Sequence, residues 1–274
     1  MKKSRRSFLK VAGVSALGIG VAPALKAVAT ASASTPSAAV RTKAPEALEA
    51  KRWGMVIDTS KITDEIAEKI VLACHKSNNV PDFNHEPDKE KYPNTRPVNH
   101  KQELKWIWEE HFNNAFPDKE DDFLANKFKN LPFLVTCNQC KNPPCVRVCP
   151  TRATFKREDG IVMMDFHRCI GCRFCMAACP YGARSFNYRD PKPFIAKIDP
   201  AFPTRSKGVV EKCNLCAPRL AKGLQPACVE VSEGAITVGD LEDPNSEVRQ
   251  LLGEKYSIRR KQELGTEPSV YYIM

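Results

Sequence analysis

The sequence predicts a fold of the α+β class that is organised around groups of cysteine side chains. Its 274 residues include twelve cysteines, which fall along the chain in groups of one, four, four and three. Between the two groups of four, residues 160–165 form a short apolar run typical of a β-strand. Residues 63–73 instead repeat apolar side chains at helical spacing. Strands and helices are therefore both expected close to the cysteines.

The second group of four has the spacing of a loop that binds a cubane iron–sulfur cluster. In the bacterial pattern, three closely spaced thiolates hold one cubane, and a fourth, followed by proline, holds the neighbouring cluster. A zinc site instead uses pairs of ligands separated by a long gap. Gly171 lets the backbone come close to the cluster, and Pro180 ends the turn. The ligand positions of this run are Cys169, Cys172, Cys175 and Cys179.

The first group of four repeats this pattern with two extra residues before its third cysteine. Its place directly upstream of a complete run supports the same chemistry, and an exchange of fourth ligands then predicts two clusters. Residues 146–148 and 177–178 are expected in short helical turns between third and fourth ligands. Site A is predicted to consist of Cys137, Cys140, Cys145 and Cys179, and site B of Cys169, Cys172, Cys175 and Cys149.

The formal net charge of +10 gives little support for nucleic-acid binding. Residues 1–33 contain six basic residues and no acidic one, so only +4 belongs to the rest of the chain. That remainder has no run in which basic and aromatic residues are interleaved. The length allows one large domain or two small ones.

Residues 1–33 have the features of a twin-arginine signal peptide. Residues 4–10 contain the paired arginines, residues 11–25 are uncharged, and small-residue cleavage sites follow at 29–33. A membrane anchor is the alternative, but fifteen uncharged residues are short for a span of about twenty. The resemblance to twin-arginine substrates implies export of the folded protein, with its cofactor inserted, to the periplasm or the outer face of the membrane. No later segment approaches spanning length, so any membrane part is expected to belong to another subunit.

Several segments around the cysteine runs resemble those of a known family. Over roughly residues 52–274, the chain is similar to the four-cluster ferredoxin subunits of the dimethyl-sulfoxide-reductase type. The resemblance implies two nested bacterial-ferredoxin-like modules with loop and helix insertions. It also implies electron transport between a catalytic or cytochrome subunit and a membrane quinone-reactive subunit. The segments that carry this resemblance are 52–58, 78–81, 142–145, 234–236 and 265–272. Two further segments, 105–109 and 184–190, resemble more narrowly the exported iron–sulfur subunits of Dsr-type membrane complexes of sulfur-metabolising prokaryotes.

The chain departs from the four-cluster pattern at its two outer runs. Three thiols of the first run, expected after residues 58–61, are absent, and Cys74 stands alone in the fourth position. The segment that replaces them predicts an amphipathic helix over residues 63–73, capped by Thr63. The last run ends on Ser232 where its fourth cysteine is expected. One face of the predicted helix contains Ile62, Ile66, Ile70 and Cys74.

By this resemblance, the four lost thiols would have bound one cluster, and the four that remain bind another. The implied total is three [4Fe–4S] clusters. The main alternative is a three-cysteine site that Ser232 or water completes, with Cys74 packed as an ordinary core thiol. Site C is predicted to consist of Cys74, Cys213, Cys216 and Cys228.

The resemblance also implies an order of clusters and two partners. The missing cluster is the terminal one, next to a molybdenum subunit in the family. The remaining order is expected to run from site C through site B to site A at the membrane-facing end. An integral membrane quinone-reactive subunit is the expected partner there, and a c-type cytochrome or another redox subunit at the opposite end.

Other conspicuous residues have ordinary explanations. Trp106 and Trp108 lie in an insertion, 86–131, that predicts a loop plus a helix; core packing is the default for them, and a partner-facing patch the alternative. The histidines share no spacing and are expected in surface or capping roles, whereas arginines near the cysteine loops are expected to raise cluster potentials. The histidines are His75, His85, His100, His111 and His167, and the arginines are Arg147, Arg168, Arg173, Arg184 and Arg219.

The predicted function is the relay of single electrons, without a catalytic site of its own, because the sequence has no nucleophile–base set and no phosphate-binding glycine loop. Two alternatives are an electron-transfer subunit of a molybdenum oxidoreductase and a structural module held by zinc or disulfides. The predicted organisation is a signal peptide at 1–33, an outer module with one cluster at 50–85 plus 201–240, an insertion at 86–131, an inner module with two clusters at 132–200, and a tail at 241–274 that wraps the modules or docks a partner.

Overall fold

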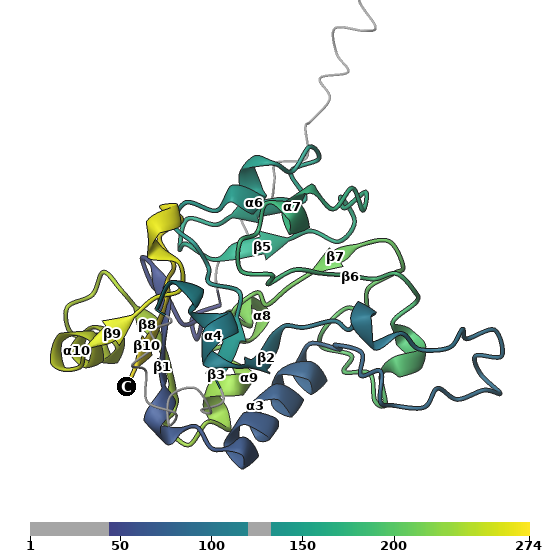
Figure 1. Ribbon diagram of the computed structural model, residues 1–274, viewed down its shortest axis with the longest axis horizontal. Helices are drawn as coiled ribbons and strands as arrows, with labels where there is room; N and C mark the ends of the chain where they lie inside the picture. The colour runs from purple at the N-terminus through teal and green to yellow at the C-terminus, as the bar shows by residue number, and fades with distance from the viewer. Residues whose placement is uncertain (1–43, 120–132) are drawn as a thin grey trace, which may run out of the picture. The chain divides into compact units, whose positions relative to one another are not determined.

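A four-stranded sheet brings the two ends of the described chain together. The computed structural model describes residues 44–119 and 133–274, so the predicted signal peptide lies outside the described residues. β1 is parallel to β10 and antiparallel to β8, and all six residues of β1 are buried because it is an interior strand. Figure 1 labels the four strands of this sheet. Their order across the sheet is β8 (Ile236–Asp240), β1 (Trp53–Asp58), β10 (Val270–Ile273) and β9 (Ser257–Ile258).

Residues 241–274, for which the sequence predicts a tail, supply two strands of this sheet. They form α10 (Glu247–Glu254), β9, the 3-10 turn η5 (Gln262–Leu264) and β10. β10 lies in the interior of the sheet, and Tyr272 and Ile273 are buried there. Valine, isoleucine and tyrosine favour strands, but the pairing partner of this strand is at the opposite end of the chain. The sequence pattern therefore does not reveal that the segment completes the core.

Helix α3 (Asp64–Ser77) confirms the amphipathic helix predicted after the first strand. Thr63 is its N-cap, and the Thr63 side chain accepts a hydrogen bond from the backbone N–H of Ile66. Ala67, Ile70 and Cys74 are its buried residues, so Cys74 points into the core. The 3-10 turn η1 (Thr59–Lys61) connects β1 to this helix. The helix extends four residues past the predicted end and stops at Asn78.

The insertion contains a strand where the sequence predicts a loop plus a helix. β2 (Ile107–Glu110) pairs antiparallel with β3 (Phe133–Thr136), so Trp108 lies in a strand. Trp106 is 1% exposed, which confirms core packing for this residue. The prediction missed β2 because its partner strand lies beyond the insertion. The short elements of the insertion are η2 (His100–Gln102), α4 (Phe112–Ala115) and η3 (Pro117–Lys119); residues 120–132 lie outside the described chain.

The cysteine-rich segment has the predicted pattern of short helices and a strand. The strand predicted at 160–165 is present as β5, which forms a hairpin with β4. Short helices α6 and α7 contain the third cysteine of each complete run, and they contact one another (Figure 1). The elements of this segment are α6 (Pro144–Arg147), β4 (Thr154–Lys156), β5 (Val162–Met164), α7 (Phe174–Ala177), β6 (Ser185–Phe186), η4 (Lys192–Phe194) and β7 (Val210–Glu211).

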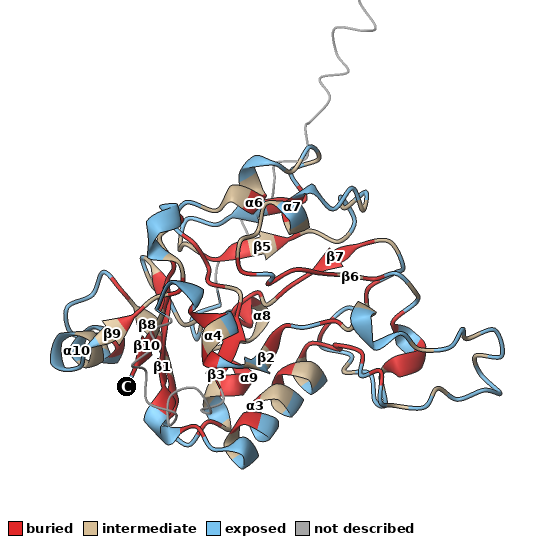
Figure 2. Ribbon diagram, in the orientation of Figure 1, coloured by how far each residue is buried: buried red, intermediate tan, exposed pale blue. Residues whose placement is uncertain are grey.

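A buried ion pair fixes the segment that enters the last cysteine run. The side chains of Arg205 and Glu211 are both fully buried and bonded to each other. Glu211 also accepts hydrogen bonds from Trp106 and Asn187, so its charge is fully partnered. Around this pair, both residues of β7 and Ser185 of β6 are buried (Figure 2). Two short helices follow, α8 (Ala217–Leu220) and α9 (Ala227–Glu230), and α9 packs against α3.

Within residues 44–119 and 133–274, no helix combines the length and the apolar character that crossing a membrane requires.

Candidate functional site

The first cysteine pairs of the three runs share one backbone feature. The residue directly before the second cysteine has a positive φ in all three loops: 45° at Gln139, 70° at Gly171 and 54° at Leu215. A left-handed residue at this position turns successive backbone N–H groups toward one point, an arrangement that binds anions. The N–H of Leu215 already lies 3.4 Å from the sulfur of Cys213. Each loop is therefore shaped to enclose a negatively charged group.

Gly171 is required by packing as well as by its backbone angle. A Cβ atom at this position would collide with the carbonyl oxygen of Gly208 and press on the ring of Phe186. The sequence assigns Gly171 to close approach of a cluster. The structure shows in addition a close approach to the neighbouring chain segment, which only glycine allows.

The four thiols predicted for site A line one internal cavity. Three of them come from the first run and Cys179 comes from the end of the second, so this cavity groups the thiols that the predicted exchange of fourth ligands combines. Burial, followed by the neighbouring thiol of Cys137, raises the pKa of Cys140 to about 12. Such a thiol keeps its proton at neutral pH unless a bound cation displaces it. The site A thiols in this cavity are Cys137, Cys140, Cys145 and Cys179.

Two residues that line the site A cavity present polar atoms without partners. Both polar atoms of the Asn138 side chain and Nη2 of Arg184 are buried and have no hydrogen-bond partner in the structure. A buried donor without an acceptor costs about 1–3 kcal/mol. The sulfides and thiolates of a cluster are acceptors for such donors. The donor set and the cysteines therefore fit a [4Fe–4S] cluster.

Site C is a second cavity, and all four of its predicted thiols line it. Cys74 enters from α3, and Cys213, Cys216 and Cys228 enter from the last run. Burial raises the pKa of Cys74 well above its usual value, and the three other thiols raise it further. Burial likewise raises the pKa of Cys228 strongly, followed by the effect of Cys216 and Cys213. Four thiols that repel one another as anions are thus held around one space.

Asn78 ties the helix end to site C. Its side-chain amide donates to the carbonyl oxygen of Cys74 at 2.9 Å and lies 3.9 Å from the Cys74 sulfur and 3.7 Å from the Cys216 sulfur. It also caps α3 at its C-terminus. The same side chain therefore ends the helix and orients two thiols.

Ser232, the alternative fourth ligand, is engaged elsewhere. Its side chain is fully buried, but it does not line the site C cavity. Its hydroxyl donates to the carbonyl oxygen of Val229 at 2.8 Å and accepts from the N–H of Ile236 at 3.1 Å. It therefore stabilises the turn between α9 and β8.

Replacing Ser232 by alanine is expected to lower stability without loss of iron. The N–H of Ile236 would lose its acceptor, which costs about 1 kcal/mol. A lower urea midpoint with unchanged iron content per chain is the expected result. Loss of four irons would instead make Ser232 a ligand.

Site B is more open than the other two sites. Cys149, Cys169 and Cys175 pack in one small apolar cluster, whereas Cys172 is exposed. The sulfur of Cys169 receives the N–H of Val210 at 3.5 Å. Burial acts to raise the pKa of Cys149, but hydrogen bonds from Thr154 and Thr151 outweigh it, and the pKa is lowered. This thiolate is therefore stabilised before any metal binds.

The sites lie in the order C, A, B, which corrects the predicted order C, B, A. The pKa of Cys213 in site C is raised to about 11. Burial is the largest cause, and the neighbouring Cys137 thiol of site A is the second largest. On the opposite side, Cys145 of site A and Cys175 of site B belong to one apolar cluster. Thr136, the last residue of β3, lines the site C cavity, and the next residue is the first thiol of site A. Strand β3 therefore places site A in the middle.

Two buried cations occupy the junctions between neighbouring sites. Lys212 is 1% exposed, and its ammonium donates to the carbonyl oxygens of Val162 and Cys213. Val162 lines the site A cavity and Cys213 that of site C. Arg184 is 5% exposed, and the thiols of Cys145 and Cys175 raise its pKa although burial opposes them. Neither cation has a carboxylate partner among the described residues.

A single metal ion and a cubane cluster require different spacings between their thiol ligands. Four sulfurs around one zinc ion lie about 3.8 Å apart, given a bond of about 2.3 Å. Among the described residues, no group of three or more histidine, cysteine, aspartate or glutamate side chains is close enough for a single ion. All twelve cysteines are unpaired. A four-iron cubane is larger than a single ion, so its ligands surround a cavity, as the thiols of sites A and C do.

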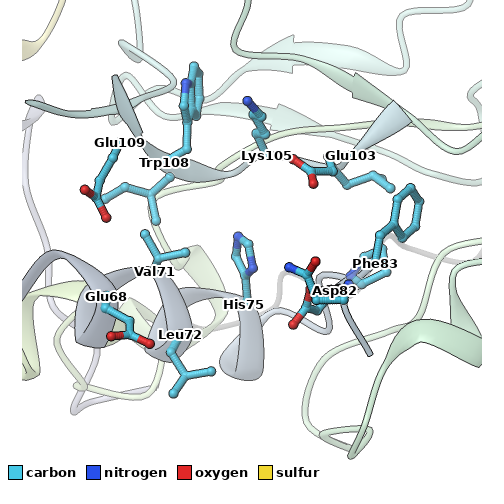
Figure 3. Close-up of a pocket in the computed structure, with 14 residues that line it drawn as sticks. Glu68, Val71, Leu72, His75, Asp82, Phe83, Glu103, Lys105, Trp108 and Glu109 are labelled. Carbon is cyan, nitrogen blue, oxygen red and sulfur yellow. Dashed lines mark hydrogen bonds between the residues drawn. The ribbon is translucent and has the colours of Figure 1, made fainter. Parts of the chain in front are cut away.

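A groove beside site C contains a half-buried histidine. His75 directly follows Cys74, and its ring lies between α3 and residues 103–109 (Figure 3). Its Nε2 atom is buried and has no hydrogen-bond partner. His100 instead pairs with Glu103 at 3.1 Å on the surface. The structure gives the described histidines no common site.

The site is that of a protein that binds [4Fe–4S] clusters and transfers electrons. Its thiols lie around cavities, its cysteine loops contain left-handed residues, and buried donors without partners line site A. A family model described as a 4Fe-4S dicluster domain matches residues 130–194, which contain sites A and B. The chain belongs to the family of iron–sulfur electron-transfer subunits of dimethyl-sulfoxide-reductase-type and Hdr-like menaquinol oxidoreductases.

Three relatives extend over most of the chain. The Hdr-like menaquinol oxidoreductase iron-sulfur subunit 1 of Archaeoglobus fulgidus is 37% identical, over 98% of this chain and 97% of its own length. One subunit of the selenate reductase of Mesobacillus selenatarsenatis is 34% identical, over 98% of this chain and 97% of its own length. The menaquinone reductase iron-sulfur cluster-binding subunit of Nitratidesulfovibrio vulgaris is 36% identical, over 81% of this chain and 88% of its own length. The similarity thus extends well beyond the two complete cysteine runs.

Proposed function

We propose that the chain relays single electrons through three [4Fe–4S] clusters, one in each of sites A, B and C. The observation that supports a third cluster is the cavity of site C, which is lined by Cys74 from α3 and by three thiols of the last run. Each cluster, when bound, supplies one-electron chemistry by alternating between two charge states. The twelve cysteines are then used without remainder.

The protein supplies fixed ligands, low polarity and compensating charge. Prolines and apolar side chains close the site A cavity, and Trp106 and Ile107 close that of site C. Lys212 and Arg184 place positive charge between neighbouring sites. Positive charge near a cluster favours its reduced, more negative state, and burial opposes it. The chain therefore sets the potential of each site through solvent exclusion and these two cations.

The relay has two ends, at site C and at site B. Around the exposed Cys172 of site B, Ile170 is 67% and Phe174 59% exposed. Large exposed apolar side chains next to a redox site suit contact with another subunit. We assign this end to an integral membrane quinone-reactive subunit, as the menaquinol and menaquinone names of two relatives support. The end at site C then faces a c-type cytochrome or another redox subunit.

The narrower proposal is that the chain is the iron–sulfur subunit, DsrO, of a Dsr-type membrane complex in sulfur metabolism. It rests on the resemblance at residues 105–109 and 184–190. We further propose two nested ferredoxin-like modules, the outer at 50–85 plus 201–240 and the inner at 132–200. The twin-arginine motif at residues 4–10 supports export and a place at the periplasmic face of the membrane.

A second candidate is the electron-transfer subunit of a molybdenum oxidoreductase. The full-length similarity to a selenate reductase subunit favours it. The absence of three thiols after residues 58–61 and the serine at position 232 argue against it, because they remove the cluster that the family resemblance places next to molybdenum. Copurification of a molybdenum-containing subunit with the chain would decide for this candidate.

Iron counting and EPR on the anaerobically purified protein test the number of clusters. We expect about twelve irons per chain, four for each of three cubanes. The fully reduced protein is expected to show the spin of three interacting clusters. An iron content near eight or sixteen would contradict three clusters, and a colourless protein with zinc would make the chain a structural module.

A further inference from the structure

A groove lies directly outside site C. It has a volume of about 380 Å³ and is bounded by α3 on one side and by residues 103–109 on the other. Figure 3 shows the side chains of Val71 and His75 rising from α3 toward Trp108 and Lys105 across this groove. Part of its lining is apolar, through Val71, Leu72 and Phe83 among others.

Only a thin wall separates the groove from the site C cavity. Ile107 lines both the groove and that cavity, and it is 2% exposed. His75, which lines the groove, is adjacent in the chain to the Cys74 ligand. A redox group that covered the groove would therefore be separated from site C by little more than one side chain.

The rim of the groove is acidic. Four carboxylates and one lysine contribute to its lining. Burial, followed by repulsion from Asp64 and Glu68, raises the pKa of Glu109. Neither Glu68 nor Glu109 has an ion-pair partner among the described residues. The lining residues that carry charge are Glu68, Asp82, Glu103, Glu109 and Lys105.

The opposite end of the relay has exposed cations, of which Arg168 forms an ion pair with Asp165 at 3.2 Å. The surface around site B presents exposed arginines on the two cysteine loops and beside them. One of them, Arg173, stacks on the rings of Phe186 and Tyr188. Two carboxylates without an ion-pair partner among the described residues, Glu68 and Glu109, thus lie at the site C end, whereas exposed arginines lie at the site B end. The exposed arginines are Arg147, Arg152, Arg168 and Arg173.

We propose that this acidic groove is the docking surface for a redox protein that presents lysine or arginine side chains around its redox group. The inference rests on the proposed function, because it takes site C as one end of the relay. Basic side chains would pair with Glu68 and Glu109, whose charges the fold leaves unneutralised. Complementary charge steers a partner to the correct end and accelerates encounter, with a strong dependence on salt. The same field repels an anionic partner, which the arginines at site B attract.

The test uses the reduced, cluster-loaded protein and three one-electron oxidants. In each reaction one electron leaves the protein and reduces the oxidant: hexaammineruthenium(III), hexacyanoferrate(III) or a basic c-type cytochrome. The variant is E68Q with E109Q, and the matched control is E254Q with E263Q, two exposed carboxylates outside the groove. Stopped-flow mixing at low ionic strength gives the second-order rate constants.

We expect the groove variant to react about three- to tenfold more slowly with the two cationic oxidants, and with a weaker salt dependence. Its rate with the hexacyanoferrate anion should not fall, and the control pair should behave as wild type. The docking proposal would be overturned if the rate constants with the cationic oxidants fell equally in the groove variant and in the control variant. It would also be overturned if they did not fall in the groove variant. Iron content and EPR are measured on the same samples, so a failure of the three-cluster assignment is recognised separately.

Discussion

Replacing Cys74 by alanine is expected to remove one cluster and to leave the other two. The iron content should fall from about twelve to about eight per chain, since a cubane needs four ligands. Cys74 is the only site C ligand outside the last run, and it is buried on α3 against the other three thiols. EPR of the reduced variant should lose the signals that arise from interaction between sites C and A.

The control for this variant separates loss of a ligand from loss of packing. Cys74→Ser keeps the volume of the side chain and weakens its affinity for iron, so it should lose or degrade the same cluster. Ala73→Ser changes the neighbouring residue, which is outside the site C lining, and should keep all three clusters. If both Cys74 variants retain about twelve irons, Cys74 is a packed core thiol and the site C assignment is wrong.

Replacing Lys212 by methionine is expected to lower the midpoint potentials of sites A and C. The Lys212 ammonium is buried between the two cavities and contacts carbonyl oxygens of both. A unit charge near a buried redox centre is worth about 2 kcal/mol per electron at an effective dielectric constant of about 20, which corresponds to a shift on the order of 100 mV. Methionine has a similar volume, so the packing is largely kept.

Redox titration followed by EPR measures this effect site by site. The potential of site B should shift less than those of sites A and C in the Lys212 variant, because the ammonium contacts carbonyl oxygens of residues that line sites A and C. Lys212→Arg retains the charge and should restore most of the shift, whereas the exposed Lys207→Met should have little effect. A uniform shift of all three sites, or none, would mean that the buried ammonium has only a structural role.

The complete cysteine runs were predictable because their ligands are local. Two-residue spacing between the first thiols, and a proline after the fourth, place three ligands of each site within one loop. The left-handed residues in the three pairs follow the same local pattern. The amphipathic helix with Cys74 on its buried face also followed from spacing alone. These predictions needed no knowledge of the partner segments.

Predictions that depended on distant pairing were less complete. Strand β2 was missed because its partner β3 lies beyond the insertion. The last strand, β10, lies beside β1 in the sheet although more than two hundred residues separate them in the chain. The order of the sites was wrong for the same reason, since β3 carries site A next to site C.

Buried charge was the other feature that sequence reasoning missed. The sequence analysis did not identify Lys212 or Asn78 as site residues. Lys212 directly precedes Cys213, and Asn78 lies one helical turn after Cys74, and both cysteines are thiols of site C. The position of Lys212 could have been recognised from the sequence. Two valines begin the short run that ends at this lysine, and a cysteine follows it directly. Such a pattern places a cation at the end of a buried strand.

The sequence by itself determined the chemistry: thiolates in numbers and spacing that suit cubane clusters, and a chain of the iron–sulfur subunit family. It also determined that one cysteine was left over from the local pattern, at position 74. The tertiary structure alone decided where that cysteine points, which sites are neighbours, and which end carries an acidic groove. The reason is physical. Local spacing fixes which ligands lie in one loop, whereas burial, electrostatic repulsion between thiols and pairing of distant strands depend on the whole fold.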